Sequence, residues 1–449
     1  MYNAIVIGGG PGGYACAIRA AQLGGSVCLI EKNGLGGTCT QRGCIPTKYL
    51  HSLGDIIRRA SGAKKSGLNI QKIELNYKIL KSRMDATVSR LASGIKFLLK
   101  SNDISLVEGE AHMISENKVK VNDIMLETKN IVIATGSYPV CLQGYEFGAN
   151  ILSTSSILEL EELPSSIAII GGGYSGCEFA CILNALGCKV SLIEAEDHLM
   201  PFQIQEIGDT VEKYMMLDGI NVMTKSRVKK IVDNNIAFVN RKEEEEQLEA
   251  EKILVCIGRR PNTNPNELNN IGIKFNEKGI SVDKKMQTNI PNIYAIGDVT
   301  GMYELAHIAS KQGEVAAENI MRIKEEEDDN NKIDYRSLPV CVFTYPEVAF
   351  VGDLNGRSGE FPLAASAKAN CLGDTRGYVK VFEKEGRLVG TYIIAPHAGE
   401  LIAEAAIAIK MKMSPKDVFD TIHAHPTLPE SFAEAVRDIN SEAIHLPAP

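Results

Sequence analysis

The sequence predicts an α/β fold in which one βαβ unit occurs twice and is followed by a separate α+β segment. The first observation is the duplication: a short apolar strand, a glycine-rich turn and a small-residue helix begin at residue 4 and again at residue 167. The second is a set of apolar runs that stop at glycine, at residues 131–136, 253–258 and 292–297, as buried strands of a parallel sheet do. The third is the length of 449 residues, enough for about two to four domains.

Composition and charge exclude several classes of protein. Apolar residues make up 44% and charged residues 23%, as in a globular protein with sizeable cores. A net charge of -8 without a long basic stretch argues against nucleic acid or an anionic membrane as the main partner. No apolar run reaches the roughly 18 residues of a membrane span, and the chain enters its first strand without a leader. The scattered, odd-numbered cysteines predict reduced thiols in a cytoplasmic protein.

Each copy of the duplicated unit has the residues of a dinucleotide site. The first glycine allows a tight turn, the second lets the backbone approach a pyrophosphate, and the third lets the helix pack closely. The phosphates then lie at the positive end of the helix, and a glutamate at the end of the second strand accepts hydrogen bonds from a ribose. One such motif is weak evidence, but two complete units with the same spacing predict two sites. The residues are Gly8, Gly10, Gly13 and Glu31 in the first site, and Gly171, Gly173, Gly176 and Glu194 in the second.

Residues at the strand ends refine these sites. A 2′-phosphate opposite Glu194 would meet a like charge with no arginine at the strand end, which predicts NAD rather than NADP. Thr135 and Gly136 end a strand of the first site, and Gly258 ends one of the second. Asp298 follows a further strand, where a carboxylate is suited to the hydroxyls of a cofactor. It is also suited to cap a helix, and both interpretations remain open.

A cysteine pair is the first chemical centre. Cys39 and Cys44 are five residues apart, and a helix starting near Cys39 would place the sulfurs within disulfide reach. So small a ring adds little stability, which favours a redox disulfide over a structural one. A helix N-terminus and Lys48 nearby predict a low thiol pKa. Two inert thiols or half a metal site are the alternatives, but the sequence has no second cysteine pair for zinc, so no metal is expected.

A histidine near the C-terminus is the second chemical centre. His425 is followed by Pro426, which is a candidate for a cis bond, and Glu430 comes five residues later. An imidazole titrates near neutrality and can take the proton of a thiol, while the carboxylate fixes its tautomer. The alternative is a surface histidine pair, His423 and His425, before a helix. The cysteine pair in the same chain favours the base.

Together these motifs resemble the pyridine nucleotide–disulfide oxidoreductases, over essentially the whole chain. The resemblance implies that the first unit binds FAD and the second the nicotinamide nucleotide. It implies that Cys39 exchanges with the substrate disulfide and that Cys44 lies against the flavin. It also implies that Asp298 and the segment 305–313, with Ala306, close over the flavin. Lys48 matches the lysine beside the flavin, with Glu178 as its ion-pair partner; a solvated helix lysine is the alternative.

The C-terminal motif is most similar to family members that oxidise protein-bound dihydrolipoyl groups with NAD. There the matching histidine reaches the disulfide of the other subunit, which implies a homodimer. The implied partners are lipoyl-bearing domains of 2-oxo acid dehydrogenase or glycine cleavage complexes. Glutathione-type reductases use NADP, which Glu194 opposes, and mercuric-type enzymes need a C-terminal cysteine pair beyond Cys371, the last cysteine here. Another disulfide reductase of the family, or a non-catalytic flavoprotein with a structural or redox-sensing role, remains the alternative.

Domain boundaries and several departures complete the predictions. The expected domains are 1–145 for FAD, 146–265 for NAD, 266–333 completing the FAD site, and 334–449 for dimerisation. Residues 72–100 have helical apolar spacing, at Ile79, Met84, Val88, Leu91, Ile95, Leu98 and Leu99, and residues 400–413 predict another helix. The charged run 242–246 predicts a hairpin tip, and 324–331 a polar boundary loop. Two departures from the family pattern are Arg42 between the cysteines and the stretch 351–361, where an expected helix and strand are replaced by glycine, asparagine and serine.

Overall fold

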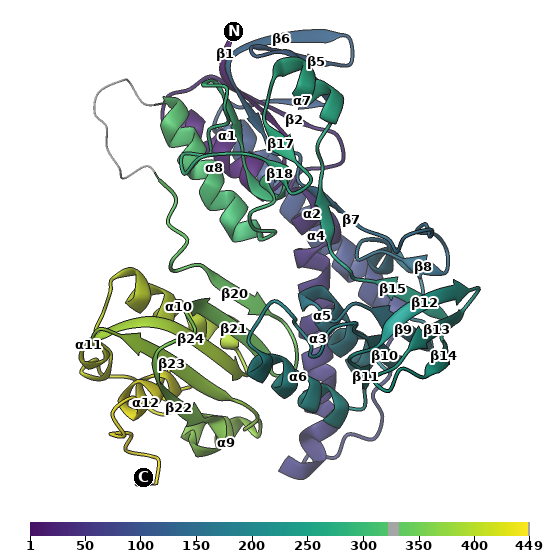
Figure 1. Cartoon of the computed structure of the whole chain (residues 1–449), viewed down its shortest axis with the longest axis vertical. Coiled ribbons are helices and arrows are strands. Elements are labelled where there is room, and N and C mark those ends of the chain that lie inside the picture. Colours follow the sequence, from purple (N-terminus) through teal and green to yellow (C-terminus); the bar gives the residue numbers. More distant parts are fainter. Residues whose placement is uncertain (322–331, 448–449) are drawn as a thin grey trace. The chain divides into compact units, whose positions relative to one another are not determined.

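The computed structural model describes residues 1–321 and 332–447 of the chain (Figure 1). The predicted loop 324–331 lies outside the described residues. The described chain divides into two compact units. Unit 1 contains residues 1–52, 74–163 and 257–333, and unit 2 contains residues 53–73, 164–256 and 334–449. The predicted domain boundary at residue 333 coincides with a boundary between the two units. The predicted boundaries at residues 145 and 265 both fall inside unit 1. The division into four domains stays a prediction.

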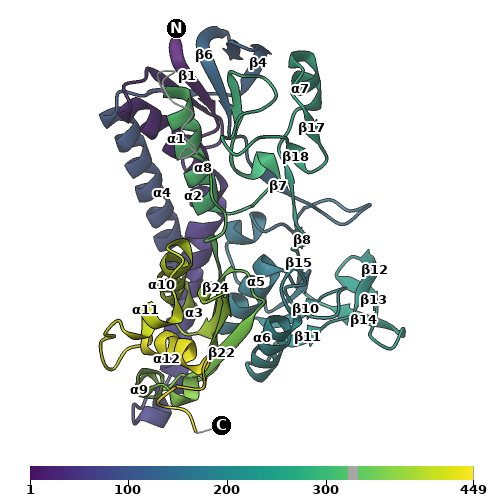
Figure 2. The same ribbon diagram turned by 60° about the vertical axis from the view of Figure 1, so that its left-hand side comes forward.

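Unit 1 is built on a parallel sheet in the order β3-β2-β1-β6, with β19 on the other side of β6. The inner strands β1 and β2 and the end of β6 carry runs of apolar residues that are buried on both faces, as expected for a parallel sheet covered by helices. Helices α1 and α8 lie side by side against it (Figures 1 and 2). The elements of the sheet and these helices are β1 (Tyr2–Ile7), α1 (Pro11–Gln22), β2 (Val27–Glu31), β3 (Ser105–Glu108), β6 (Ile124–Ile133), β19 (Ile293–Ala295) and α8 (Ala306–Met321).

Other elements of unit 1 surround this sheet. The predicted long helix forms as α4 (Tyr77–Ser101), and the Asn76 side chain caps it by accepting the Ile79 N–H. Met84, Ile95 and Leu99 are buried, whereas Ile79, Leu91 and Leu98 are exposed in the single chain. The remaining elements are α2 (Gly37–Arg42), α3 (Cys44–Gly62, which passes into unit 2), β4 (Ala111–Ser115), β5 (Lys118–Val121), β7 (Ser137–Pro139), β8 (Ile151–Leu152), η2 (Ser156–Glu159), β16 (Arg259–Pro261), α7 (Pro265–Ile271), β17 (Phe275–Asn276), β18 (Gly279–Ile280) and η3 (Gly297–Thr300).

Unit 2 repeats the topology of unit 1. Its strands run β11-β10-β9-β15, which is the order of the matched strands β3-β2-β1-β6. The hairpin predicted at 242–246 is confirmed, with its tip at the largely exposed residues 240–244, while Glu245 and Glu246 already belong to the second strand. The elements are η1 (Ala63–Ser66), β9 (Ser166–Ile170), α5 (Tyr174–Ala185), β10 (Lys189–Ile193), α6 (Gln205–Leu217), β11 (Asn221–Met223), β12 (Arg227–Val232), β13 (Asn235–Val239), β14 (Glu245–Glu249) and β15 (Lys252–Val255).

The C-terminal part of unit 2 is the predicted α+β segment. A five-stranded antiparallel sheet, in the order β20-β21-β24-β23-β22, packs its apolar face against helices α10 and α12. The expected helix at 400–413 forms as α10. The elements are β20 (Pro339–Val342), β21 (Glu347–Gly352), β22 (Arg357–Pro362), η5 (Leu363–Ala365), α9 (Ala367–Leu372), β23 (Tyr378–Lys384), β24 (Arg387–Ala395), α10 (Ala398–Lys410), α11 (Pro415–Phe419) and α12 (Glu430–Asp438).

The stretch 351–361 corrects one expectation. Residues 353–356 connect β21 to β22 without a helix, as predicted, but the strand is not lost, because β22 pairs with β23 along its whole length. Its glycine has a packing reason: a Cβ on Gly359 would lie 2.2 Å from the Ala435 carbonyl oxygen. Glycine therefore lets α12 approach the strand backbone directly.

Among the described residues, no helix is both long enough and apolar enough to span a membrane.

Candidate active site

The two glycine turns have the same geometry. The first glycine of each turn has a positive φ, 108° at Gly8 and 104° at Gly171. A Cβ on Gly13 would lie 1.8 Å from the Gly8 carbonyl oxygen, and one on Gly176 would lie 1.9 Å from that of Gly171. Any side chain at the third position would push the helix off the turn. The sequence argument for these glycines is thus borne out by the backbone in both copies.

The middle glycines leave the helix N-termini open. Gly10 and Gly173 are the N-caps of α1 and α5, and neither helix has an acidic residue in its first turn. A Cβ on Gly173 would meet nothing within 4 Å, and one on Gly10 would meet only Gly37, at 4.0 Å. Neither helix has a side-chain cap, and the space beside each N-cap glycine is open at the positive end of the helix. This arrangement fits the pyrophosphate of a dinucleotide in each unit.

The two strand-end glutamates accept hydrogen bonds from the backbone of their glycine turns. Glu31 accepts hydrogen bonds from the Gly9 N–H and the Asn33 N–H, both at 2.6 Å. Glu194 accepts from the Gly172 N–H at 2.5 Å and the Glu196 N–H at 2.7 Å. Each carboxylate oxygen keeps a second lone pair, so the carboxylates can also accept from a ribose. The same pair of hydrogen bonds in both copies shows that these glutamates shape the turn, and their contact with a nucleotide stays a prediction.

Asp298 is fixed by side chains that are distant in sequence. Its carboxylate accepts a hydrogen bond from the Ser137 hydroxyl at 2.5 Å and lies 4.0 Å from the Arg259 guanidinium. The N-cap of η3 is Ile296, and Asp298 lies in its first turn, so the capping interpretation is wrong. Burial, together with the Asp298 charge, raises the pKa of nearby Glu304, and Arg259 partly offsets this. The ordered carboxylate at a strand end fits the hydroxyls of a flavin side chain.

Other predicted cofactor residues lie at strand ends or helix starts. Thr135 donates its hydroxyl to the Asn262 carbonyl oxygen, and Gly136 has a φ of 72°. Ala306 is the first residue of α8. Gly258 belongs to unit 1, whereas the other residues predicted to bind NAD belong to unit 2. Its place in the NAD site therefore stays a prediction.

The cysteine pair lies where two helices meet. Cys39 is in α2, Cys44 begins α3, and Gly43 separates them because a Cβ there would lie 2.8 Å from the Thr38 carbonyl oxygen. Both residues are thiols in this structure. A hydrogen bond to Cys44, together with burial, raises the pKa of the Cys39 thiol, and the opposite effect of Lys48 is smaller. The expected low pKa is therefore wrong for Cys39, since the neighbouring sulfur outweighs the lysine.

The predicted ion pair between Lys48 and Glu178 joins different units. Lys48 lies in the part of α3 that belongs to unit 1, and Glu178 lies on α5 in unit 2. Glu178 is buried, and its carboxylate accepts the Phe343 N–H at 3.0 Å. The carboxylate is thus oriented from the dimerisation segment, and the ion pair stays a prediction.

His425 and Glu430 form the predicted pair. The His425 Nδ1 lies 2.8 Å from one Glu430 oxygen, and the Thr427 N–H donates to the other at 2.6 Å. Burial raises the pKa of Glu430, but the bonds from Thr427 and His425 outweigh it, so the pKa is lowered and the group is a carboxylate. With Nδ1–H held by Glu430, Nε2 is the basic nitrogen of the neutral ring. The predicted cis bond between His425 and Pro426 is confirmed.

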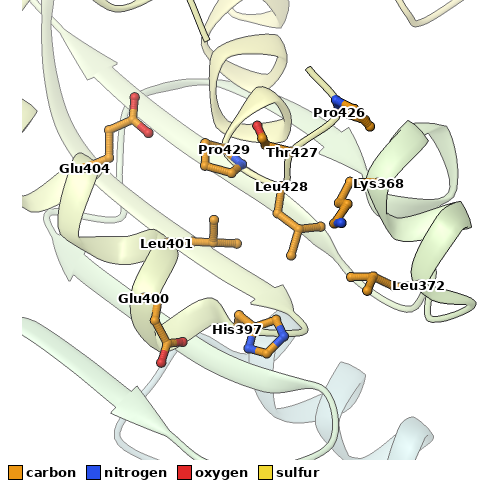
Figure 3. A pocket seen from close by; sticks show the side chains of 10 residues that line it. All are labelled: Lys368, Leu372, His397, Glu400, Leu401, Glu404, Pro426, Thr427, Leu428 and Pro429. Carbon is orange, nitrogen blue, oxygen red and sulfur yellow. The ribbon is translucent and has the colours of Figure 1, made fainter. Parts of the chain in front are cut away.

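Two further features near the base were not predicted. His423 contacts Glu404 of α10 at 2.8 Å. A cavity of about 510 Å³ lies between α9, α10 and the residues that follow His425 (Figure 3). Two residues that line this cavity, His397 and Glu400, have potential ligand atoms that lie within 4.8 Å of each other and of one on Glu347. The sequence gave no indication of either feature, because the residues that form each one come from separate helices and loops. The expected absence of a metal stays a prediction.

Comparison with known proteins agrees with this geometry. Residues 2–313 match the family model described as pyridine nucleotide-disulphide oxidoreductase, and residues 338–436 match its dimerisation domain. The chain is 37% identical to the dihydrolipoyl dehydrogenase of Chlamydia pneumoniae, over 99% of this chain and 98% of that protein. It is 36% identical to the dihydrolipoyl dehydrogenase of Staphylococcus aureus, over 99% and 97%.

Solved structures give the same result. LpdA from Mycobacterium tuberculosis has a TM-score of 0.87 at 25% identity, covering 97% of this chain and 99% of that one. The flavoprotein disulfide reductase RclA from Escherichia coli has a TM-score of 0.84 at 25% identity, covering 96% and 99%. The dimerisation-domain match supports a homodimer. On this evidence the chain belongs to the pyridine nucleotide–disulphide oxidoreductases, enzymes that use FAD and NAD(H).

Proposed function

We propose that the chain oxidises protein-bound dihydrolipoyl groups to lipoyl groups and reduces NAD⁺ to NADH. The observation that carries the proposal is the combination of a hydrogen-bonded Cys39–Cys44 pair with the His425–Glu430 pair in a chain that has two dinucleotide-type turns. Dihydrolipoyl dehydrogenases of similar sequence over their full length support the choice of substrate.

Thiol–disulfide exchange accounts for the work of the cysteines. One substrate thiolate attacks Cys39 of the oxidised pair, so the Cys39–Cys44 bond breaks and a mixed disulfide forms. The proton of the first substrate thiol passes to solvent. His425 takes the proton of the second substrate thiol, whose thiolate then attacks the substrate sulfur of the mixed disulfide, closes the lipoyl disulfide and displaces Cys39, which receives that proton. Two electrons now reside on the cysteine pair. The hydrogen bond to Cys44, together with burial, raises the pKa of Cys39 and favours its protonated form in the reduced pair, so Cys44 would be the sulfur that carries the charge.

The cofactors supply the electron chemistry when bound: FAD accepts two electrons from the cysteine pair and passes a hydride to NAD⁺. Gly10, Glu31 and Asp298 would hold FAD, and Gly173 and Glu194 would hold NAD. Lys48, by its positive charge, would stabilise negative charge that develops on the flavin. These roles rest on the open helix ends and the ordered carboxylates of each unit.

The substrate and the dimer are linked in this proposal. His425 of one subunit would serve the cysteine pair of the partner subunit, so a monomer would be inactive. The side chain of His425 is 69% exposed in the single chain, as expected for a base that acts outside its own subunit. The substrates would be lipoyl-bearing domains of 2-oxo acid dehydrogenase or glycine cleavage complexes.

The test is NADH formation from NAD⁺ and dihydrolipoamide, with NADP⁺ in parallel. Turnover with NAD⁺ that is abolished by Cys44→Ser is expected, while Cys371→Ser, which changes an exposed cysteine elsewhere, should leave it intact. Absence of turnover in a flavin-loaded dimer would refute the proposal. Reduction of another disulfide by NADH would then be the next candidate, favoured by the similarity to a flavoprotein disulfide reductase.

A further inference from the structure

The loop that carries the base is exposed and needs an anchor. Residues 421–429 connect α11 to α12 largely without regular structure. Ile422 is 96% exposed, and the His425 side chain is 69% exposed. Downstream of the base, Leu428 is buried in the C-terminal core. A base whose proton transfer depends on sub-ångström placement also needs support on its upstream side.

His423 supplies an upstream contact. Its side chain is only 11% exposed, although residues 422 and 424 on either side of it are exposed. Its Nε2 lies 2.8 Å from the Glu404 carboxylate, and its Nδ1 lies 2.9 Å from the Thr421 carbonyl oxygen. Both partners are acceptors, so both bonds form when each ring nitrogen carries a hydrogen. His423 then joins a carboxylate on α10 to the backbone of its own loop.

The other end of this contact is a rigid element. Helix α10 buries Ile402, Ala405 and Ala408 in the C-terminal core, so the position of Glu404 is fixed by packing. Glu404 also lines the cavity in Figure 3, together with the four residues that follow His425. The helix therefore flanks the loop on both sides of the base.

We propose that His423 and Glu404 are positioning residues, which hold the loop 421–429 on α10 so that His425 is presented in its working orientation. This inference rests on the proposed function in one respect, because its effect on activity is measured as the oxidation of dihydrolipoamide. Neither residue touches the reacting sulfurs in it; both act through His425. The sequence showed His423 as one half of a histidine pair, and the structure gives the two histidines different partners and different tasks.

The test compares His423→Ala, Glu404→Ala, Glu404→Gln and the double alanine variant with wild type. His112→Ala is the matched control, because His112 forms a histidine–glutamate contact of 2.7 Å with Glu267 in the other unit. Each alanine variant should lower kcat for dihydrolipoamide by about ten- to a hundredfold with little change in KM. Glu404→Gln keeps an acceptor oxygen and should retain most of the activity. The double variant should be no worse than the poorer single one, because both remove one contact.

Two further measurements distinguish a misplaced loop from a general loss of folding or flavin binding. Reduction of a dye by NADH bypasses the base and should stay unchanged, and hydrogen exchange should rise in the peptide 420–430 alone. Unchanged kcat and unchanged exchange in both alanine variants would overturn the proposal, as would parallel loss of the dye reaction. If wild type itself fails to oxidise dihydrolipoamide, the proposed function fails, and the exchange measurement alone decides whether His423 and Glu404 hold the loop.

Discussion

Replacing Glu430 by glutamine gives the sharpest test of the base. The carboxylate accepts two N–H groups, from His425 and from Thr427. An amide has one acceptor oxygen and one NH₂ group, so in either orientation one of these donors faces another donor. A hydrogen bond to a charged group is worth about 1.5–3 kcal/mol, which corresponds to a fall in kcat/KM of about 10- to 150-fold. A fall in kcat/KM of about tenfold or more is therefore expected for the Glu430→Gln enzyme.

The assay is steady-state oxidation of dihydrolipoamide with NAD⁺, with dye reduction by NADH as the reaction that needs no base. Glu360→Gln, the same chemical change on strand β22, is the control and should behave as wild type. A Glu430→Gln enzyme with kcat/KM within about twofold of wild type would refute the reasoning, because a change that small leaves no room for the lost bond. Equal loss in the dye reaction would indicate a folding or flavin defect instead.

Three other changes test the cofactor preference, the packing of β22 and the buried carboxyl of the C-terminal sheet. Glu194→Gln removes the negative charge and keeps one of the two hydrogen bonds from the backbone. The ratio of kcat/KM for NAD⁺ to kcat/KM for NADP⁺ should therefore fall by about tenfold or more. An unchanged ratio would mean that the charge does not select the nucleotide. Gly359→Ala places a Cβ against the Ala435 carbonyl and should lower the free energy of unfolding by about 1–3 kcal/mol, whereas Gly94→Ala, in the open middle of α4, should raise it by about 0.5–1 kcal/mol. Burial raises the pKa of Glu347 to about 7, so its contribution to stability is present below its unfolded pKa and lost as pH rises through 7; Glu347→Gln should therefore raise Tm at pH 8 more than at pH 5, and an equal change at both would contradict this.

Patterns that are local in sequence were predicted well. The duplicated turn, the strand-end glutamates and the pair His425–Glu430 are each set by spacing within about thirty residues, because a helix or a tight turn brings such residues together. The same spacing says nothing about burial or about partners from other elements. The thiol pKa of Cys39 was therefore predicted in the wrong direction, since the spacing suggested a lysine nearby but not the stronger effect of the adjacent sulfur.

Contacts between distant segments could not be predicted. Asp298 is held from Ser137 and Arg259, and Glu404 meets His423 across a turn and a short helix. Glycine at 359 counted against a strand, as it does on average, yet here it is what lets α12 pack on that strand. Tertiary packing overrides local preference at such positions, and a single sequence carries no sign of it.

The strand-end glutamates have a structural role in addition to any contact with a nucleotide. Glu31 and Glu194 each accept a hydrogen bond from the glycine turn and another from the residue two positions further on. The two units are expected to bind different dinucleotides, so a contact common to both reflects the turn rather than the ligand. A glutamate at this point is therefore required for the shape of the site before any choice between NAD and NADP is made. The evidence for NAD is consequently the negative charge of Glu194 at the strand end, to which Glu196 and Asp197 add two further charges, and not its hydrogen bond to the turn. Among the described residues, Lys225 is the one lysine within ion-pair distance of these three carboxylates, and it contacts Asp197 at 3.2 Å.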